Sequence, residues 1–393
     1  MTEALTPIRM RRVALIIESK RAYGRRILDG IASYMREIEP WEIFIEPRAL
    51  HDPAPRWLFS WQGDGIIARI MDDKVLTKIK ERGIPLVNIK GTLTDADNVP
   101  DFSIDRFAIG KMAAEHLIER RFRNFAFAGF KAVWSDLIYQ GFSETLEKYG
   151  FSCNEYRDTL KFTDSYREVA MEREIDQTAQ WLKTLPAPVG IVAADDYLGI
   201  QILSACRKIG LKVPDMAAVL GLGNDETLCN LCSPTLSSLH YNEQLLGRKS
   251  AEKLDLLMRG EPVNPDPELI LPLGITVRHS TDVEAVDDEL VRSALSFIRE
   301  NLNRNINIDN LVESLGVPRS TLQRRFKKAL GRSVYETILD WRLQRVMELL
   351  AHTNITVKQI ARLTGFRFVE HLNGLFKLKT GMTLLTYRKI SSK

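Results

Sequence analysis

The sequence has few cysteines and no long apolar run. Only Cys153, Cys206, Cys229 and Cys232 occur in 393 residues, which excludes a small disulfide-stapled scaffold and favours a reducing compartment. Nowhere do eighteen apolar residues run together, so we expect no membrane partner. The early run VALII (13–17) is too short for the core of a signal peptide and predicts a buried strand. We therefore expect a cytoplasmic protein.

The usual signatures of catalysis and metal binding are also missing. CNLC (229–232) has zinc or redox spacing, but no second pair exists, and we expect both thiols to pack in a short helix before Pro234. The six histidines are scattered, with none at ligand or catalytic spacing. No GxxxxGK[ST] loop occurs, and GLGND (221–225) is too short for a dinucleotide fingerprint. We expect no metal, no cofactor and no catalytic residue.

Charge is distributed unevenly along the chain. From Glu289 onward there are 19 Lys and Arg against 8 Asp and Glu, a net charge of +11. The preceding residues carry 36 against 43, a net charge of −7. A basic terminal region joined to an acidic body is expected where one part meets phosphate and the other does not.

The first 280 residues alternate short apolar runs with segments of helical period. The runs lie at 12–17, 42–46, 65–70, 85–89, 125–130, 190–194 and 217–223. Alternation of this kind predicts parallel sheets covered by helices. Two such series follow one another, so we expect an α/β sensor of two lobes. The chain is expected to cross from the first lobe to the second near residues 103–125. The helical segment that ends at Gly260 belongs to the second series and is expected in the second lobe.

Polar and aromatic residues follow these strands, at the edge where parallel sheets bind ligands. They suit a polyhydroxylated ligand, because rings stack on aromatic faces while polar groups pair with hydroxyls. Simple capping of the strand ends explains them equally well. The candidate ligand-binding residues are Ser19, Tyr23, Arg25, Arg69, Trp134, Asp196, Asn224 and Asp225.

A polar, acidic segment at 281–288 predicts a linker, and 289–393 predicts an all-α domain. Asp309 is a candidate helix N-cap, Gly316 a helix end, and Thr356 with Gln359 a capping box. Residues about 308–330 and about 356–379 repeat one pattern: short helix, glycine, turn and second helix. Each is a helix-turn-helix signature, which indicates binding to double-stranded DNA. The long helix between them is expected to hold the two units at a fixed separation.

Two known families resemble the two halves of the chain. STLQRRFKKALGRS, YETILDWRLQRVMELL and ITVKQIARLTGF resemble the DNA-binding domain of the AraC family. RILDGIASYMRE, FSIDRFAIGKMAAEHLIERRFRNFAFAG and GIVAADDYLGIQIL resemble the periplasmic-binding-protein-like sensor of the LacI/galactose-repressor family. Both halves in this order are similar to the family of bacterial xylose operon regulators. The resemblance implies a sugar-responsive transcription activator that binds an operator as a homodimer and contacts RNA polymerase.

The resemblance also assigns roles to single positions. The residues that it places against DNA are Arg319, Ser320, Thr321, Gln323 and Arg324 in the first unit, and Arg367, Val369, Glu370, His371, Asn373 and Lys377 in the second. Lys379 is a further expected phosphate contact. In the sensor, Ile138 and Gly223 stand where the family has a sugar-holding arginine and aspartate, so the hydroxyl contacts differ from the family pattern. Leu384 replaces a usual proline.

Two alternative functions remain at this stage. One is an AraC-type domain fused to a catalytic domain that acts on a carbohydrate, and the other is a transport receptor, which shares the sensor fold. The scattered histidines oppose the first, and the basic helical region opposes the second. The expected mechanism is that ligand closes the two lobes and changes the spacing of the DNA-binding domains in a dimer.

Overall fold

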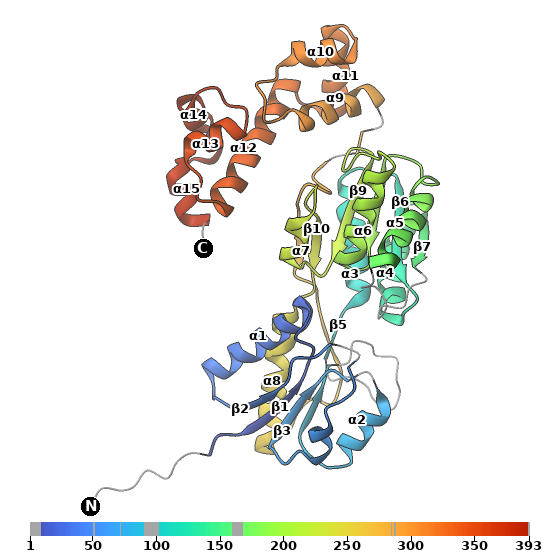
Figure 1. Ribbon diagram of the computed structural model, residues 1–393, viewed down its shortest axis with the longest axis vertical. Helices are drawn as coiled ribbons and strands as arrows, with labels where there is room; N and C mark the ends of the chain where they lie inside the picture. Colours follow the sequence, from blue (N-terminus) through green and yellow to red (C-terminus); the bar gives the residue numbers. More distant parts are fainter. Residues whose placement is uncertain are drawn as a thin grey trace, which may run out of the picture. The chain divides into compact units, whose positions relative to one another are not determined.

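The computed structural model describes residues 9–49, 52–70, 72–89, 102–158, 168–283, 285–286 and 288–391. The chain forms two compact units, Met1–Val283 and Glu284–Lys393, which divide inside the segment predicted as a linker. Figure 1 shows an α/β unit of two lobes and a helical unit. Among the described residues, no helix has the length and apolar character needed to cross a lipid bilayer.

The first lobe of the α/β unit contains a four-stranded parallel sheet in the order β2-β1-β3-β4. Its strands are β1 (Arg12–Ile16), β2 (Glu42–Ile45), β3 (Gly65–Ala68) and β4 (Leu86–Asn88). The helices are α1 (Ala22–Glu37), the short 3-10 helix η1 (Arg56–Ser60) and α2 (Asp73–Lys80). These four strands confirm the strands predicted between residues 12 and 89. The runs in β1, β3 and β4 are largely buried between packed layers, whereas β2, at the edge of the sheet, is partly exposed.

The second lobe has a six-stranded sheet in the order β12-β10-β9-β8-β6-β7. The strands are β6 (Asn124–Phe130), β7 (Cys153–Asp158), β8 (Val189–Ala193), β9 (Ala217–Leu222), β10 (Ser237–His240) and β12 (Gly274–Thr276), which alone is antiparallel to its neighbour. The helices are α3 (Arg106–Glu119), α4 (Val133–Lys148), α5 (Glu168–Leu182), α6 (Asp196–Lys208) and α7 (Glu226–Leu231). As predicted, CNLC lies in and just after a short helix before Pro234, with Cys229 buried.

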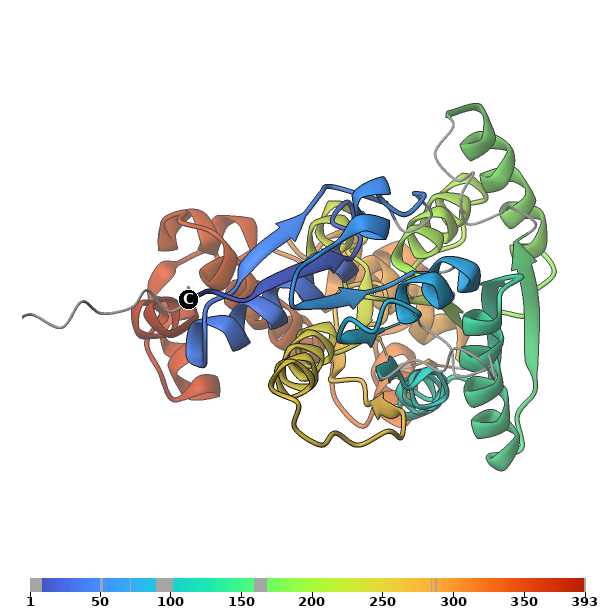
Figure 2. The ribbon, with the colours of Figure 1, turned by 90° about the horizontal axis from the view of Figure 1, so that it is seen from below.

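The chain passes between the lobes more than once. It first crosses at β5 (Phe102–Ile104), which pairs in parallel with β11 (Glu268–Ile270). Between these strands, α8 (Glu243–Arg259) returns to pack on α1, as Figure 2 shows from below. The assignment of this helical segment to the second lobe was therefore wrong. A Cβ at Gly30 would lie only 2.0 Å from the backbone oxygen of Gln244, so α1 and α8 can approach this closely only because position 30 is glycine.

The helical unit contains α9 (Glu289–Glu300), α10 (Ile308–Leu315), α11 (Arg319–Leu330), α12 (Val334–His352), α13 (Val357–Leu363), α14 (Val369–Thr380) and α15 (Leu384–Ser391). The predicted capping box of Thr356 and Gln359 is confirmed. The N-cap assigned to Asp309 was wrong, because Asn307 caps α10 through the backbone N–H groups of Asp309 and Asn310. Leu384, at the position of the missing proline, is buried in the core.

Candidate functional sites

The first helix-turn-helix comprises α10, a turn at Gly316 and α11. Gly316 has a φ of 62°, in the left-handed region that glycine adopts without steric cost. Leu322 and Phe326 on α11 are fully buried. The opposite face of α11 exposes Arg319, Ser320, Gln323, Arg324 and Lys327, while Thr321 is half-buried. The predicted base-contacting residues therefore share one accessible face, except for the partial burial of Thr321.

The second helix-turn-helix comprises α13, a turn at Gly365 and α14. Leu372 and Phe376 are fully buried, fifty residues after their counterparts in α11. Gly331 and Gly381, which end the two second helices, both have φ near 72°. The exposed face of α14 carries Glu370, His371, Asn373 and Lys377, with Val369 half-buried. Like α11, α14 therefore presents most of the predicted residues on the face away from its core, whereas Val369 packs against that core.

Helix α12 joins the two units through two separate cores. Val334 and Ile338, near its beginning, pack with the first unit. Leu343, Val346 and Leu350 pack with the second unit. Helix α12 is also bound to the loop between α9 and α10, because Arg342 Nη2 donates a hydrogen bond of 2.6 Å to the backbone oxygen of Arg304. These contacts support the expectation that α12 holds the two units at a fixed separation.

Several cations near these helices already have acidic partners. Arg319 Nη1 lies 3.2 Å from Asp309 Oδ1, and Lys379 Nζ lies 2.8 Å from Asp340 Oδ1. Arg325, which the sequence analysis did not single out, pairs with Asp288. Arg324 and Lys327 lie exposed on α11, and the Arg367 guanidinium stacks 5.2 Å from the Phe368 ring centroid. Lys379 is thus less available for phosphate than predicted.

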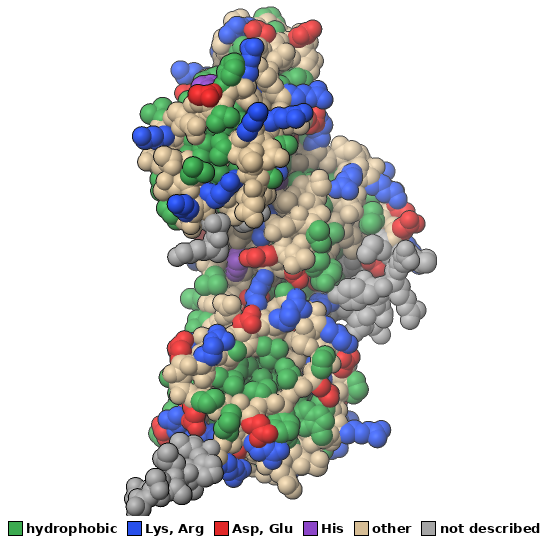
Figure 3. All heavy atoms as spheres, turned by 60° about the vertical axis from the view of Figure 1, so that its left-hand side comes forward, with side chains coloured by type: hydrophobic (Ala, Val, Ile, Leu, Met, Phe, Trp, Pro, Cys, Tyr) green, Lys and Arg blue, Asp and Glu red, His purple; other side chains and the backbone are tan. Residues whose placement is uncertain are grey.

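The basic character of the helical unit is visible on its surface. Figure 3 shows more Lys and Arg side chains than Asp and Glu over the face of this unit that it presents. A hollow beside the second helix-turn-helix is lined by Lys358, Arg362, Arg367 and Glu370, together with Asn303 and Asn305 from the loop before α10. Three cations against one carboxylate make this hollow attractive to anions, such as DNA phosphates.

In the α/β unit, residues from the strand ends of both lobes gather at the lobe boundary. From the first lobe, Arg69 forms an ion pair with Glu18, and both side chains are almost completely buried. The Arg69 guanidinium also stacks 4.5 Å from the Tyr23 ring centroid. Burial alone would lower the pKa of Arg69, but the charges of Glu18 and Tyr23 outweigh it and raise the pKa. Burial raises the pKa of the Tyr23 hydroxyl.

The second lobe contributes Arg106, Trp134 and Tyr241 to this boundary. The Arg106 guanidinium lies 4.8 Å from the Tyr241 ring centroid and 5.9 Å from that of Trp134. Tyr23 meets Tyr241 edge-on, with ring centroids 6.1 Å apart, which links the two lobes. We call Glu18, Tyr23, Arg69, Arg106, Trp134 and Tyr241 the interlobe cluster. Of these six residues, Tyr23, Arg69 and Trp134 were predicted from the sequence, and Glu18, Arg106 and Tyr241 were not.

The predicted residues Asp196, Asn224 and Asp225 form a hydrogen-bonded group at the end of β9. Asp196 is buried and accepts hydrogen bonds from the Ser238 hydroxyl at 2.5 Å and the Asp225 backbone N–H at 2.7 Å. Burial raises its pKa to about 7, although both hydrogen bonds oppose that change. Asn224 is fully buried and accepts from Arg278 Nη1 at 2.8 Å, while Asp225 caps α7. Their side chains thus organise this loop.

The remaining predicted ligand residues lie at the start of α1. Ser19 Oγ accepts a hydrogen bond from the Arg48 backbone N–H, and exposed Arg25 donates to the Ser19 backbone oxygen. The neighbouring Arg26, absent from the sequence prediction, bridges the lobes. Its guanidinium donates to the backbone oxygens of Gly223, at 2.6 Å, and Asn224, and pairs with Glu243 at 3.2 Å.

The two departures from the family pattern have structural explanations. Ile138 is fully buried in α4, where α3 and α4 cross closely at Gly110. Gly223 has a φ of 115° and offers its backbone oxygen to Arg26 in place of a side chain. A guanidinium is nevertheless present at the lobe boundary, where Arg106 stacks on Trp134 and Tyr241.

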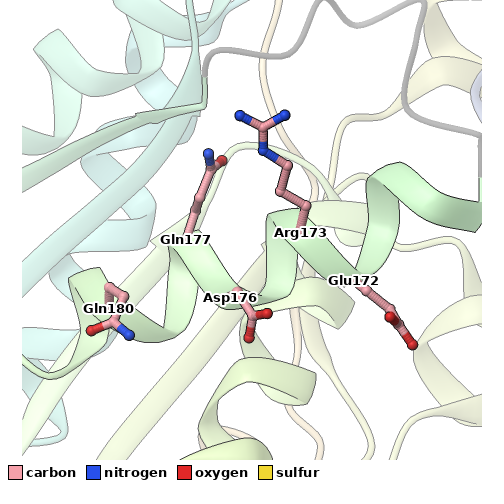
Figure 4. A pocket seen from close by; sticks show the side chains of 5 residues that line it. All are labelled: Glu172, Arg173, Asp176, Gln177 and Gln180. Carbon is pink, nitrogen blue, oxygen red and sulfur yellow. The ribbon is translucent and has the colours of Figure 1, made fainter.

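A shallow hollow on α5 lies away from these residues. Its lining residues, Glu172, Arg173, Asp176, Gln177 and Gln180, all come from one helix, as Figure 4 shows. Asp176 already forms an ion pair with Lys208. The hollow brings together no residues from different strand ends, so it is not a candidate site for the effector.

Known protein families match both the α/β unit and the helical unit. The XylR N-terminal domain model matches residues 12–108, the periplasmic binding protein-like domain model matches 114–281, and the helix-turn-helix domain model matches 311–390. The xylose operon regulatory protein of Haemophilus influenzae is 28% identical over 96% of this chain and 98% of its own length. That of Escherichia coli K12 is 26% identical over 97% of this chain and 98% of its own length.

Solved structures give the same result. A structure of the xylose-binding transcription activator xylR, 25% identical, superposes with a TM-score of 0.80 over 98% of this chain and 99% of that chain. A LacI-type regulator from Alkaliphilus metalliredigens in complex with D-xylulofuranose matches 69% of this chain and 98% of its own, with a TM-score of 0.56. At 19% identity, the second match supports the fold of the α/β unit alone. The chain is therefore a homologue of the bacterial xylose operon regulatory proteins, a transcription regulator in which a periplasmic-binding-protein-like sensor precedes an AraC-type helix-turn-helix domain.

Proposed function

We propose that this regulator responds to a monosaccharide-sized carbohydrate, xylose or a related sugar, that binds at the interlobe cluster. The observation that carries this proposal is the meeting of Tyr23, Trp134 and Tyr241 with Arg69 and Arg106 at the lobe boundary. Aromatic faces stack on the apolar faces of sugar rings, and guanidinium and carboxylate groups pair with hydroxyls. The relatives named for the xylose operon support a sugar of this size.

Of the residues predicted from sequence, Tyr23, Arg69 and Trp134 are proposed as direct ligand contacts. Ser19, Arg25 and Asp225 are proposed to shape the surrounding loops. Asp196 and Asn224 are proposed to act through the β9 loop that they hold, since their polar atoms already have partners inside the protein.

DNA binding is proposed to use the exposed faces of α11 and α14. Arg319, Ser320, Thr321, Gln323 and Arg324 are assigned to base and backbone contacts in one major groove. Val369, Glu370, His371 and Asn373 are assigned to the next groove, with Arg367 and Lys377 on phosphates. The first unit is proposed to supply more of the affinity, because α14 carries Glu370 on its exposed face.

We further propose that the protein is a cytoplasmic transcription activator without enzymatic activity. Its sensor spans residues 1–280, its linker 281–288 and its DNA-binding domain 289–393. It acts as a homodimer and contacts RNA polymerase at its promoter. Figure 3 shows a gathering of hydrophobic side chains on one face of the first lobe, and an apolar patch of this kind supports a homodimer. Sedimentation velocity at micromolar concentration tests this point, and a monomer with and without DNA would contradict it.

Thermal unfolding of the whole protein with a panel of pentoses, hexoses and sugar acids tests the sensing function. A ligand at about a hundred times its Kd adds about 2.7 kcal/mol to the stability of the sensor, enough to raise its Tm visibly. The proposal predicts that at least one carbohydrate does so. If no member of the panel changes the Tm, the α/β unit is a dimerisation scaffold and the sensing function is wrong.

A further inference from the structure

The charge state of the interlobe cluster bears on the chemical class of the effector. Arg106, the first residue of α3, is 7% exposed, and its Nε atom is buried without a hydrogen-bond partner. Its guanidinium stacks on Tyr241 and Trp134, yet it has no hydrogen bond or ion pair with any described residue. A guanidinium has five N–H donors, and a buried charge without a partner is costly. Such a group in a native fold points to a missing acceptor.

Two other arginines at the lobe boundary are already neutralised. Arg69 is paired with Glu18, and Arg26 is paired with Glu243 at 3.2 Å. Each of these buried carboxylates therefore has its own guanidinium, and Arg106 is the one cation of the interlobe cluster that has no carboxylate partner among the described residues. As far as the described residues form it, the interlobe cluster thus carries one uncompensated cation among its aromatic rings.

Two further buried atoms of the interlobe cluster have no hydrogen-bond partner in the part of the chain that the structure describes. They are Glu18 Oε2, an acceptor, and Arg69 Nε, a donor. Both lie in the ion pair that stacks on Tyr23, on the first-lobe side of the boundary. A carbohydrate hydroxyl can satisfy both, because it donates one hydrogen bond and accepts others. The cluster therefore offers an anion-binding arginine on one side and hydroxyl partners on the other.

Resting on the proposed function, we infer that the effector is a sugar acid whose carboxylate binds Arg106 and whose hydroxyls bind Glu18 and Arg69. A carboxylate presents two oxygens in a plane, which matches the fork of a guanidinium. It also carries one negative charge, equal to the single surplus charge of the cluster. A phosphate ester carries about −1.5 to −2 at pH 7, so it would leave an uncompensated negative charge in this buried place.

Titration calorimetry with the whole protein tests this inference on matched pairs of ligands. Three pairs are compared, each a neutral sugar and an acid derived from it: D-xylose with D-xylonate, D-glucose with D-gluconate, and D-galactose with D-galacturonate. D-xylose 5-phosphate is the phosphate ester for comparison. We expect the acid of at least one pair to bind at least about tenfold more tightly than its neutral partner and than the phosphate. Neutral sugars that bind as tightly as their acids would overturn the inference and leave the proposed function intact. Tighter binding of the phosphate would overturn it too, and no binding by any probe would overturn both.

The variant Arg106→Gln separates a ligand-binding role from a structural one. It removes an unpaired buried charge, so the unliganded variant should unfold at the same Tm as the wild type or higher, while the acid loses its tenfold advantage. A structural arginine would instead lower the Tm. Arg123→Gln is the matched control, since Arg123 stacks on Phe151 at 5.3 Å but is exposed and outside the interlobe cluster. It should preserve the preference for the acid. A preserved preference in Arg106→Gln would contradict the assignment.

Discussion

Both oxygens of the Asp288 carboxylate accept hydrogen bonds from the Arg325 guanidinium, each at 2.7 Å. Asp288 is the last residue before α9 and caps that helix by accepting from the Val291 N–H at 3.2 Å. Arg325 lies on α11, the helix proposed to enter the major groove. One carboxylate thus ties the end of the linker segment to the first DNA-binding helix. A movement of the linker can therefore reach α11 without passing through its hydrophobic core.

Replacing Arg325 with Met should weaken the helical unit without changing its sequence preference. The pKa of Asp288 is lowered by its hydrogen bond from Arg325, so the pair stabilises the fold above the unfolded pKa near 4 and stops doing so as pH falls through the lower folded pKa. Thermal unfolding at pH 7 should show a lower Tm for the variant, and the difference should shrink in acid. An altered base preference would show that Arg325 reads DNA.

The neighbouring Arg324 should behave in the opposite way. Arg324 is exposed on the face of α11 that carries Gln323 and Ser320. Its replacement with Ala should cost about 1–3 kcal/mol of DNA binding, roughly 5- to 160-fold in Kd, and relax the preference at one base pair. Fluorescence anisotropy on a set of single-base operator variants measures both effects. An equal loss on every sequence would reduce Arg324 to a phosphate contact.

Arg26 should hold the two lobes together. Its replacement with Gln removes the hydrogen bonds to the Gly223 and Asn224 oxygens and leaves the buried Glu243 carboxylate without its partner. We expect a loss of up to about 3 kcal/mol in the free energy of unfolding of the sensor, because an unpaired buried charge remains. The double variant Arg26→Gln/Glu243→Gln removes that charge and should recover part of the loss in urea denaturation. A double variant as unstable as the single one would disprove the charge argument.

Asp196 should make the sensor less stable as pH rises. Its folded pKa is about 7, well above the unfolded value of 3.8, so the native state binds more protons between these values. Stability should therefore fall as pH rises from about 4 to about 7 and level off above. His116, whose pKa burial lowers to about 3, gives the opposite slope between about 3 and 6.5. The variant Asp196→Asn retains His116, so the difference between the stability of the wild type and that of the variant isolates the contribution of Asp196. If the two curves of stability against pH run parallel between about pH 4 and about pH 7, the prediction is wrong.

The sequence predicted the elements that depend on local pattern. Buried apolar runs such as 217–223 became strands because both faces of a covered parallel sheet are apolar. The repeat that aligns Phe326 with Phe376 gave both helix-turn-helix units, since their turn glycines and core positions are local. The prediction of Asp309 as an N-cap was wrong because α10 begins one residue earlier, at Ile308, where Asn307 forms a capping box with Asn310.

Features that depend on the path of the chain could not be predicted in this way. The period of α8 is that of any surface helix, and only its packing on α1 places it in the first lobe. Arg106 follows a three-residue strand and begins an ordinary helix in the sequence. Its importance appears only when the fold brings Trp134 and Tyr241, far away along the chain, against its guanidinium.

The central claim is that a carbohydrate bound to the α/β unit changes DNA binding by the helical unit. The most direct measurement selects binding sequences from random DNA duplexes with the whole protein, and then determines the Kd of the selected site with and without the carbohydrate that raises the Tm. The account predicts an enriched site of two repeated elements and a Kd that changes at least several-fold on saturation with the carbohydrate. A saturating carbohydrate that stabilises the protein but leaves this Kd unchanged, or selection without sequence enrichment, would contradict the account.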